Sequence, residues 1–128
     1  MRLNQVTVGC IDYAASVDFY TRIGLTQIVD SPPDYARFET PTGETFSIHA
    51  VDAIGHSTTI VYFETESLDH EVYKLKEAGL TFQSDPADRR WGWREARLRD
   101  PAGNEICLFN GGKNRRFPDW RIDTNTKD

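Results

Sequence analysis

The chain has 128 residues, of which 38% are hydrophobic and 12% aromatic, a composition typical of one globular domain rather than of a disordered segment. Its 15 basic and 20 acidic residues give a net charge of −5, which argues against nucleic acid or an anionic membrane surface as a partner. No apolar run has transmembrane length, the first residues lack a signal-peptide core, and the two cysteines are typical of free thiols. We therefore expect a cytoplasmic protein.

The first half of the chain predicts a strand, a helix and three further strands. Residues 3–9 alternate in polarity and predict the first strand. Residues 14–23 carry apolar side chains at helical spacing, and Gly24 ends this predicted helix. Short strands follow, separated by a loop with two prolines and by a turn, over residues 25–30, 35–39 and 45–50.

The second half repeats the same order of elements. A strand over residues 58–64 precedes a helix over 68–78, and a prolyl loop lies between the next two strands. Asp100-Pro101-Ala102-Gly103 has the residues of a type I turn. The last three strands of this half are predicted over residues 80–83, 94–99 and 105–109.

The repetition extends from the elements to the residues. "VDFYTRIGLT" (17–26) aligns with "VYKLKEAGLT" (72–81), and "PTGETFSIH" (41–49) aligns with "PAGNEICLF" (101–109). This internal repeat predicts an α+β fold of two βαβββ units that form mixed sheets. We expect one domain over residues 1–112, with its repeats at about 3–50 and 57–110, followed by a C-terminal tail over 113–128.

In such a fold the helix covers one face of each sheet, and the two bare faces enclose a cleft. Ile106 and Leu108 alternate with Glu105, Cys107 and Phe109, so the first pair should face the helix and the other three the cleft. The repeat places three residues of the first unit on the corresponding face: Thr45, Ser47 and His49.

The helix "AASVDFYTRIGL", the turn "DPAGN" and the doubled βαβββ order resemble the vicinal oxygen chelate superfamily over about residues 3–110. That superfamily holds glyoxalase I, extradiol dioxygenases, fosfomycin-resistance transferases and bleomycin-resistance proteins. The resemblance implies the glyoxalase/bleomycin-resistance/dioxygenase fold, with its sheets around a cleft. It leaves open whether the chain is an enzyme, because this fold hosts many reactions.

The resemblance also implies a divalent metal site with two ligands from each repeat. The ligand positions fall at Gln5, Ser47, Ile60 and Cys107. Isoleucine has no donor atom, serine is a poor neutral ligand, and a cysteine thiolate suits zinc or copper rather than an oxygen-rich octahedral site. These positions are not a competent set, so we expect no metal cofactor. A set of Gln5, His49 and Glu105 fails because His49 and Glu105 would lie about 13 Å apart along the sheet.

Several of these residues have both a functional and a structural interpretation. His49 and Glu105 are candidate catalytic groups, but a wall-lining histidine and a solvated glutamate are the alternatives. Cys107 is a candidate nucleophile or a buried space-filling thiol. In "RRWGWRE" (89–95), two tryptophans flank a glycine, so both rings would point the same way from an extended chain. The rings could then stack on a planar ligand. The alternative is that this segment only docks the long loop of the second repeat. The expected ligand-binding residues are Gln5, Ser47, His49, Trp91, Trp93, Glu105, Cys107 and Phe109.

The resulting hypothesis is a bleomycin-resistance-like protein that binds a small organic molecule in the cleft without the family metal, and that forms a homodimer. The alternatives are a metal-dependent lyase, isomerase or dioxygenase of the glyoxalase type, and a protein-interaction domain. The last alternative rests on the tail, where Phe117 and Trp120 lie among arginines and gain by packing on the chain itself or on a partner subunit.

Overall fold

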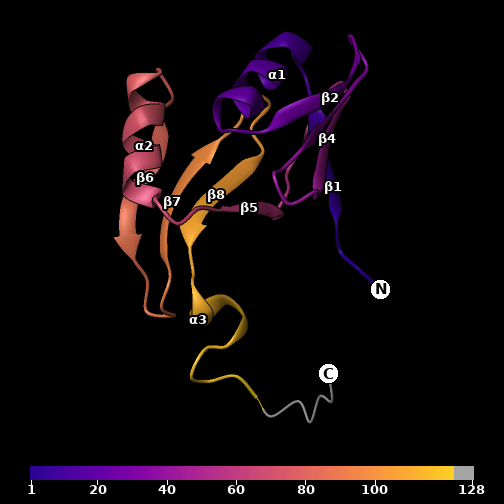
Figure 1. The fold of residues 1–128 in the computed structure, drawn as a ribbon. Coiled ribbons are helices and arrows are strands. Elements are labelled where there is room, and N and C mark those ends of the chain that lie inside the picture. Colours follow the sequence, from indigo (N-terminus) through magenta and orange to yellow (C-terminus); the bar gives the residue numbers. More distant parts are fainter. Residues whose placement is uncertain (123–128) are drawn as a thin grey trace. The chain divides into compact units, whose positions relative to one another are not determined.

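The computed structural model describes residues 1–122, and the predicted tail residues 123–128 lie outside this range (Figure 1). The first repeat forms β1 (Gln5–Cys10), α1 (Tyr13–Arg22), β2 (Thr26–Ser31), β3 (Tyr35–Glu39) and β4 (Thr45–Ala50). The second forms β5 (Ile60–Glu64), α2 (Leu68–Glu77), β6 (Phe82–Asp88), β7 (Arg94–Arg99) and β8 (Glu105–Asn110), and α3 (Lys113–Arg116) follows.

The strands form two mixed four-stranded sheets with the orders β1-β4-β3-β2 and β5-β8-β7-β6. In the first sheet β1 runs parallel to β4, while β3 runs antiparallel to both β2 and β4. This confirms the predicted α+β fold of two βαβββ repeats. The chain divides into two compact units: residues 1–61 with 99–106, and residues 62–98 with those from 107 onward.

The first unit is built around the aromatic face of α1. The helix begins after Asp12, whose carboxylate accepts a hydrogen bond from the Ala15 N–H at 3.1 Å. Tyr20 is fully buried and packs on Phe38 and Phe46 of the sheet, with 4.4 Å between the ring centroids of Tyr20 and Phe46. Ala36, Phe38, Phe46 and Ile48 are buried in β3 and β4 of this sheet.

In the second unit α2 packs on β6 (Figure 1). Acidic residues occupy its first turn and lysines its last turn, as the helix dipole favours. Leu68, Val72 and Leu75 are buried on one face of the helix. Ile106, Cys107, Leu108 and Phe109 are all buried in β8, and Phe109 contacts Trp93.

Three hairpins share one turn geometry. In each, a glycine N–H donates to the carbonyl three residues earlier at 2.9–3.0 Å, and a second bond closes the hairpin one residue further on. The glycine adopts a φ of +90° to +100°, which makes this a type I turn followed by a bulge. Only glycine adopts this conformation readily. The three glycines are Gly43, Gly92 and Gly103.

Two elements differ from the prediction. The prolyl loop after residue 83 is predicted to be irregular, but β6 continues through Pro86 to Asp88. Proline is tolerated here because β6 is an edge strand and its register with β7 shifts between Ser84 and Ala87. The four-residue helix α3 is not predicted. Within residues 1–122, none of the helices has the length and apolarity needed to cross a bilayer.

The turn between β7 and β8 belongs to the first unit, although its residues come from the second repeat. The buried Tyr20 hydroxyl donates to Oδ2 of Asp100 at 2.6 Å. Oδ1 of Asp100 accepts from the N–H groups of Ala102 and Asn104, and the Asn104 amide reaches the Gly9 carbonyl at 2.8 Å. A single carboxylate thus holds its own turn and joins that turn to α1.

We expect Tyr20→Phe to lower the free energy of unfolding by about 1–3 kcal/mol, because a buried hydroxyl that donates to a carboxylate is lost. Tyr73→Phe is the matched control, since Tyr73 is 64% exposed on α2 and its hydroxyl should contribute less than about 0.5 kcal/mol. Denaturant unfolding of both variants measures the difference. Equal losses would contradict the role assigned to the Asp100 turn.

Gly92→Ala should destabilise the chain more than Gly43→Ala does. Both substitutions place a side chain at positive φ, at a cost of about 1–2 kcal/mol. A Cβ at Gly43 meets no atom within 4 Å, whereas at Gly92 it would approach Nδ2 of Asn114 to 2.5 Å. The Gly92 variant should therefore also displace α3. Unfolding midpoints of the two variants test this, and similar losses would show that Asn114 moves aside freely.

Candidate functional site

The uncovered face of the first sheet carries a hydrogen-bonded polar network. Arg37 Nε donates to the Tyr35 hydroxyl at 2.8 Å, and this hydroxyl shares a 2.8 Å hydrogen bond with Ser47, which is fully buried. The bond with Ser47, helped by the Arg37 charge, lowers the pKa of Tyr35 below its usual value. Tyr35 therefore lies at the centre of this network, and its phenol is more acidic than usual. The hydroxyl of Ser47 is already engaged in a hydrogen bond with Tyr35.

Gln5 and His49 lie at the two ends of the same face. The Gln5 side-chain oxygen accepts a 2.7 Å hydrogen bond from the Thr45 hydroxyl. His49 is exposed at the end of β4, opposite Tyr35 on one neighbouring strand and Gly9 on the other. The sheet register confirms that Thr45, Ser47 and His49 share one face, as the repeat predicts.

The uncovered face of the second sheet carries an aromatic cluster of Tyr62, Trp93 and Phe109. The rings of Trp93 and Phe109 stack with 4.4 Å between their centroids, and Tyr62 meets both edge-on at 5.8–5.9 Å. The Trp93 indole N–H donates to the Asn114 carbonyl at 3.1 Å, which fixes the ring and holds α3. The cluster is rigid because both an aromatic stack and a hydrogen bond hold Trp93.

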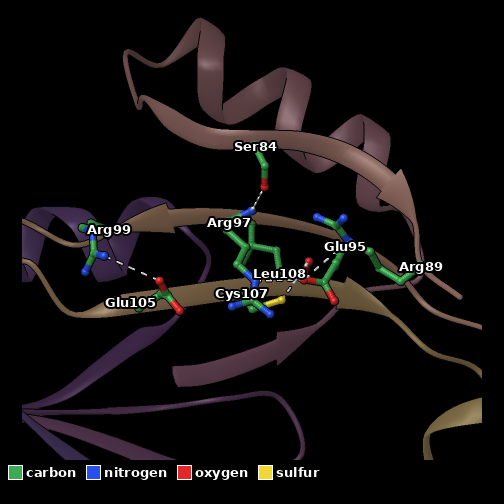
Figure 2. Close-up of polar contacts among 8 residues, drawn as sticks. All are labelled: Ser84, Arg89, Glu95, Arg97, Arg99, Glu105, Cys107 and Leu108. Atoms are coloured by element: carbon green, nitrogen blue, oxygen red, sulfur yellow. Dashed lines mark hydrogen bonds and ion pairs between the residues drawn. The ribbon is translucent and has the colours of Figure 1, made fainter. Parts of the chain in front are cut away.

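A charged cluster lies beside these rings, and Figure 2 shows its side chains together on and next to β7 and β8. Glu95 is only 1% exposed, and its Oε2 accepts from Arg97 Nε at 2.8 Å, with Arg89 Nε 3.9 Å away. Among the residues that the structure describes, the buried atoms Glu95 Oε1 and Arg89 Nε have no hydrogen-bond partner. We call Arg89, Glu95 and Arg97 the charged cluster.

Sequence reasoning selected the stretch 89–95, which contains Arg89 and Glu95, but it did not predict that Glu95 is buried and paired with Arg97. The sequence "REARLR" (94–99) does contain a pattern that places Glu95 and Arg97 together. These two residues alternate with the buried Ala96 and Leu98, so they lie on the other face of the strand. Three charged residues near one strand are usually solvated, however, and only the fold shows that Glu95 is buried.

Cys107 lies next to the charged cluster and is fully buried. Burial, followed by the negative charge of Glu95, raises the pKa of its thiol to about 12. Cys107 is therefore a neutral thiol at physiological pH, and its role as a nucleophile is disfavoured. It fills space between the strands and the charged side chains.

The family resemblance implies four metal-ligand positions, at Gln5, Ser47, Ile60 and Cys107, and their side chains do not form a suitable site for a divalent ion. Ile60 offers no donor atom, and the Ser47 hydroxyl is bound to Tyr35. Cys107 would have to lose a proton that its surroundings retain strongly. Within residues 1–122 there is also no group of three or more His, Cys, Asp or Glu side chains arranged to hold an ion.

The two tryptophans of "RRWGWRE" lie in different surroundings, contrary to the expectation of an extended chain with both rings on one side. The segment is a tight turn, with the Gly92 N–H bonded to the Arg89 carbonyl at 2.9 Å and Gly92 at a φ of +90°. Trp93 joins the aromatic cluster, whereas Trp91 lies at the turn, 5.9 Å from the Arg90 guanidinium. The positive φ of the glycine produces this separation.

Glu105 is half-buried at the start of β8 and forms an ion pair with Arg99 at 3.6 Å. It lines a hollow of about 210 Å³ in the first unit, together with Thr7, Ser57, Thr59 and Asn104 among others. The predicted ligand-binding residues thus fall into two groups within the two units. Gln5, Ser47, His49 and Glu105 lie in the first unit, and Trp91, Trp93, Cys107 and Phe109 in the second.

Comparison with solved structures supports the fold of most of the chain. A glyoxalase/bleomycin resistance protein/dioxygenase from Nocardioides is 26% identical, with a TM-score of 0.69 over 87% of this chain and 83% of that one. TioX from Micromonospora sp. ML1 is 20% identical, with a TM-score of 0.73 over 87% and 99%. A lactoylglutathione lyase from Agrobacterium tumefaciens is 16% identical, with a TM-score of 0.72 over 86% and 93%. No curated protein matches.

The family profile gives the same result at the level of sequence. It matches residues 2–108, which include the first βαβββ repeat and the second as far as Leu108 in β8. The repeat, the two mixed sheets and this match agree with one another. The chain therefore belongs to the Glyoxalase/Bleomycin resistance protein/Dioxygenase superfamily.

Proposed function

We propose that this chain binds a small, partly aromatic organic molecule on the uncovered face of its second sheet, without the metal of the family's enzymes. The observation that carries the proposal is the combination of a rigid aromatic cluster with a buried charged cluster on that face. Small-molecule sites are typically apolar walls with a few well-placed polar groups, and this face has both.

The aromatic cluster supplies the apolar surface for the ligand. Trp93 and Phe109 form a stacked pair in which Phe109 is buried, while Trp93 is half-buried and Tyr62 is 43% exposed, so the part of the cluster open to contact lies at Tyr62 and Trp93. Because hydrogen bonding and stacking already fix Trp93, little side-chain entropy is lost when a ligand packs there. A preorganised aromatic wall favours binding of a planar molecule.

The proposed absence of the family metal rests on the chemistry of the four positions. Ile60 cannot coordinate, Ser47 is bound to Tyr35, and Cys107 retains its proton. Without a Lewis acid at these positions, the metal-dependent lyase, isomerase or dioxygenase chemistry has no support from these side chains. Binding without catalysis is the simpler function for this set of residues.

An interaction role is the second candidate, and the C-terminal segment favours it. Phe117, Trp120 and Ile122 are 52–78% exposed, although each gains by burial. Arg116 and Arg121 lie over the Phe117 ring at 5.0 and 4.8 Å, so the segment combines aromatic and positive groups. A second copy of the chain, as in the expected homodimer, is one such partner.

Tryptophan fluorescence tests the proposed binding face. Titration with a library of small aromatic compounds should change the emission, because a ligand on this face contacts Trp93. Trp93→Phe should remove most of the change, and the double variant Trp91→Phe, Trp93→Phe should remove all of it. Trp120→Phe is the control and should leave it intact, since Trp120 lies in the C-terminal segment. A signal that survives the double variant but not Trp120→Phe would transfer the binding surface to that segment.

Metal content tests the other half of the proposal. We expect protein purified without chelator to contain far less than one zinc, nickel, iron or manganese ion per chain. Nickel, zinc or manganese should shift the thermal midpoint by less than about 2 °C. A resident ion at 100 times its dissociation constant would add about 2.7 kcal/mol, or roughly 10 °C for a domain of this size. One bound ion per chain would favour the enzyme alternative.

A further inference from the structure

Arg37, on the uncovered face of the first sheet, is a half-buried cation whose only acceptor among residues 1–122 is a hydroxyl. Its Nε donates to the Tyr35 hydroxyl at 2.8 Å, and its guanidinium lies 5.4 Å from the centre of the Tyr35 ring. These two contacts fix the guanidinium. Its terminal nitrogens, Nη1 and Nη2, keep their N–H donors for another acceptor.

The other half-buried arginines show what Arg37 lacks. Arg89, Arg94 and Arg97 each form an ion pair with a carboxylate. Within residues 1–122, Arg37 alone among the half-buried arginines has no such pair, although the sequence holds 20 acidic residues. A charge that is partly removed from water is normally compensated by a partner. An anionic ligand would supply the partner that this arginine does not find in the chain.

His49 places a second donor beside the guanidinium. The strand register sets Tyr35 opposite His49 and Arg37 opposite Ser47, on one face of the sheet. Arg37 and His49 are therefore diagonal neighbours on adjacent strands, with less than about 8 Å between their Cβ atoms. The His49 side chain is exposed and has no hydrogen-bond partner among residues 1–122. An oxyanion between the two side chains accepts hydrogen bonds from both.

This position is open to solvent and leads to a hollow in the same unit. Two hydrogen bonds of 2.8 Å, through the Tyr35 hydroxyl, join Arg37 Nε to the Ser47 hydroxyl, so the guanidinium is held close to β4. Thr7 lies opposite Ser47 on the next strand, is exposed, and lines the hollow of about 210 Å³. Thr7 and Arg37 are two strand spacings apart, or about 10 Å between their Cα atoms. A molecule bound to Arg37 therefore has room for its body beside Thr7.

The charges around this position restrict the ligand. A ligand ammonium would meet the Arg37 guanidinium, whereas a carboxylate is planar and matches two parallel N–H groups of a guanidinium. Glu39 follows on the same face of β3, opposite Thr45, and Glu105 lines the hollow. A second anionic group on the ligand would approach one of these two carboxylates. The ligand that fits best has one carboxylate and an uncharged body.

We propose that the uncovered face of the first sheet binds a small monocarboxylic acid. The carboxylate accepts hydrogen bonds from Nη1 and Nη2 of Arg37 and from the His49 imidazole, and the uncharged body extends past Thr7 to the hollow. This inference goes beyond the proposed function, because it concerns a separate set of residues in the other unit.

Four non-aromatic probes test the inference on the full chain at constant ionic strength. Cyclohexanecarboxylate carries the carboxylate, and cyclohexanecarboxamide is its neutral counterpart. Cyclohexylmethylammonium is a cation, and inorganic phosphate is a tetrahedral anion. We expect cyclohexanecarboxylate to bind with a dissociation constant of about 1–10 mM, at least fivefold more tightly than each of the others. Its titration should shift the Arg37 Nε–H and His49 ring signals in NMR spectra, and the shifts should saturate together.

Variants of the network separate a built site from general attraction of anions. Arg37→Gln should weaken cyclohexanecarboxylate at least fivefold, with the His49 ring as the reporter. Arg22→Gln is the matched control: it removes the same charge from α1 in the same unit, where Arg22 pairs with Asp18 at 2.9 Å, and should change binding less than twofold. Arg37→Lys keeps the charge without the planar fork and should weaken binding about threefold, which keeps the test available if Arg37→Gln does not fold.

Two kinds of result would overturn the inference. The first is equal binding of cyclohexanecarboxylate to the wild type, Arg37→Gln and Arg22→Gln. The second is binding of the carboxamide, the ammonium or phosphate as tightly as the carboxylate. Neither result bears on the face of the second sheet, which the aromatic library tests through Trp93.

Discussion

The hydrogen bond between Tyr20 and Asp100 is the constraint on which the first unit depends. It joins a helix of the first repeat to a turn of the second across 80 residues of sequence, and both groups are buried. Burial and the neighbouring carboxylate raise the pKa of Tyr20, so it is a permanent donor to Asp100 at any physiological pH. The first unit therefore includes residues 99–106, and the two compact units do not coincide with the two repeats.

The same interaction shows how far the two repeats have diverged. In the alignment of the repeats, Leu75 corresponds to Tyr20, and Thr40 corresponds to Asp100. Leu75 is buried on α2 but offers no donor, and the Thr40 hydroxyl bonds to Glu44 within its own turn. The backbone geometry of the two turns is nevertheless the same, because it requires only the glycine at the bulge. Turn geometry is thus preserved where the side-chain chemistry is not.

The sequence predicts most of the fold because hydrophobic periodicity and turn-forming residues can be recognised within short stretches of the chain. Both helices were predicted to within a residue at each end, and the alternation in β4 assigned its faces correctly. The continuation of β6 through Pro86 was missed because edge position and bulges are properties of the assembled sheet. The site was less accessible to prediction. Cys107 and Phe109 were selected by face and Trp93 from the stretch 89–95, but the burial of Glu95 depends on packing from several elements.

The contact between α3 and the β6–β7 turn has a consequence for how the protein is handled in the laboratory. Asn114 is bound to Trp93 through its carbonyl and to Gly92 through its amide, so the first residues after β8 help to position the aromatic wall. Truncation of the chain after Gly112 would free the Trp93 indole N–H and alter the aromatic cluster of Tyr62, Trp93 and Phe109 from a distance in sequence. Affinity tags are therefore better placed at the N-terminus, where Met1 and Leu3 are fully or almost fully exposed.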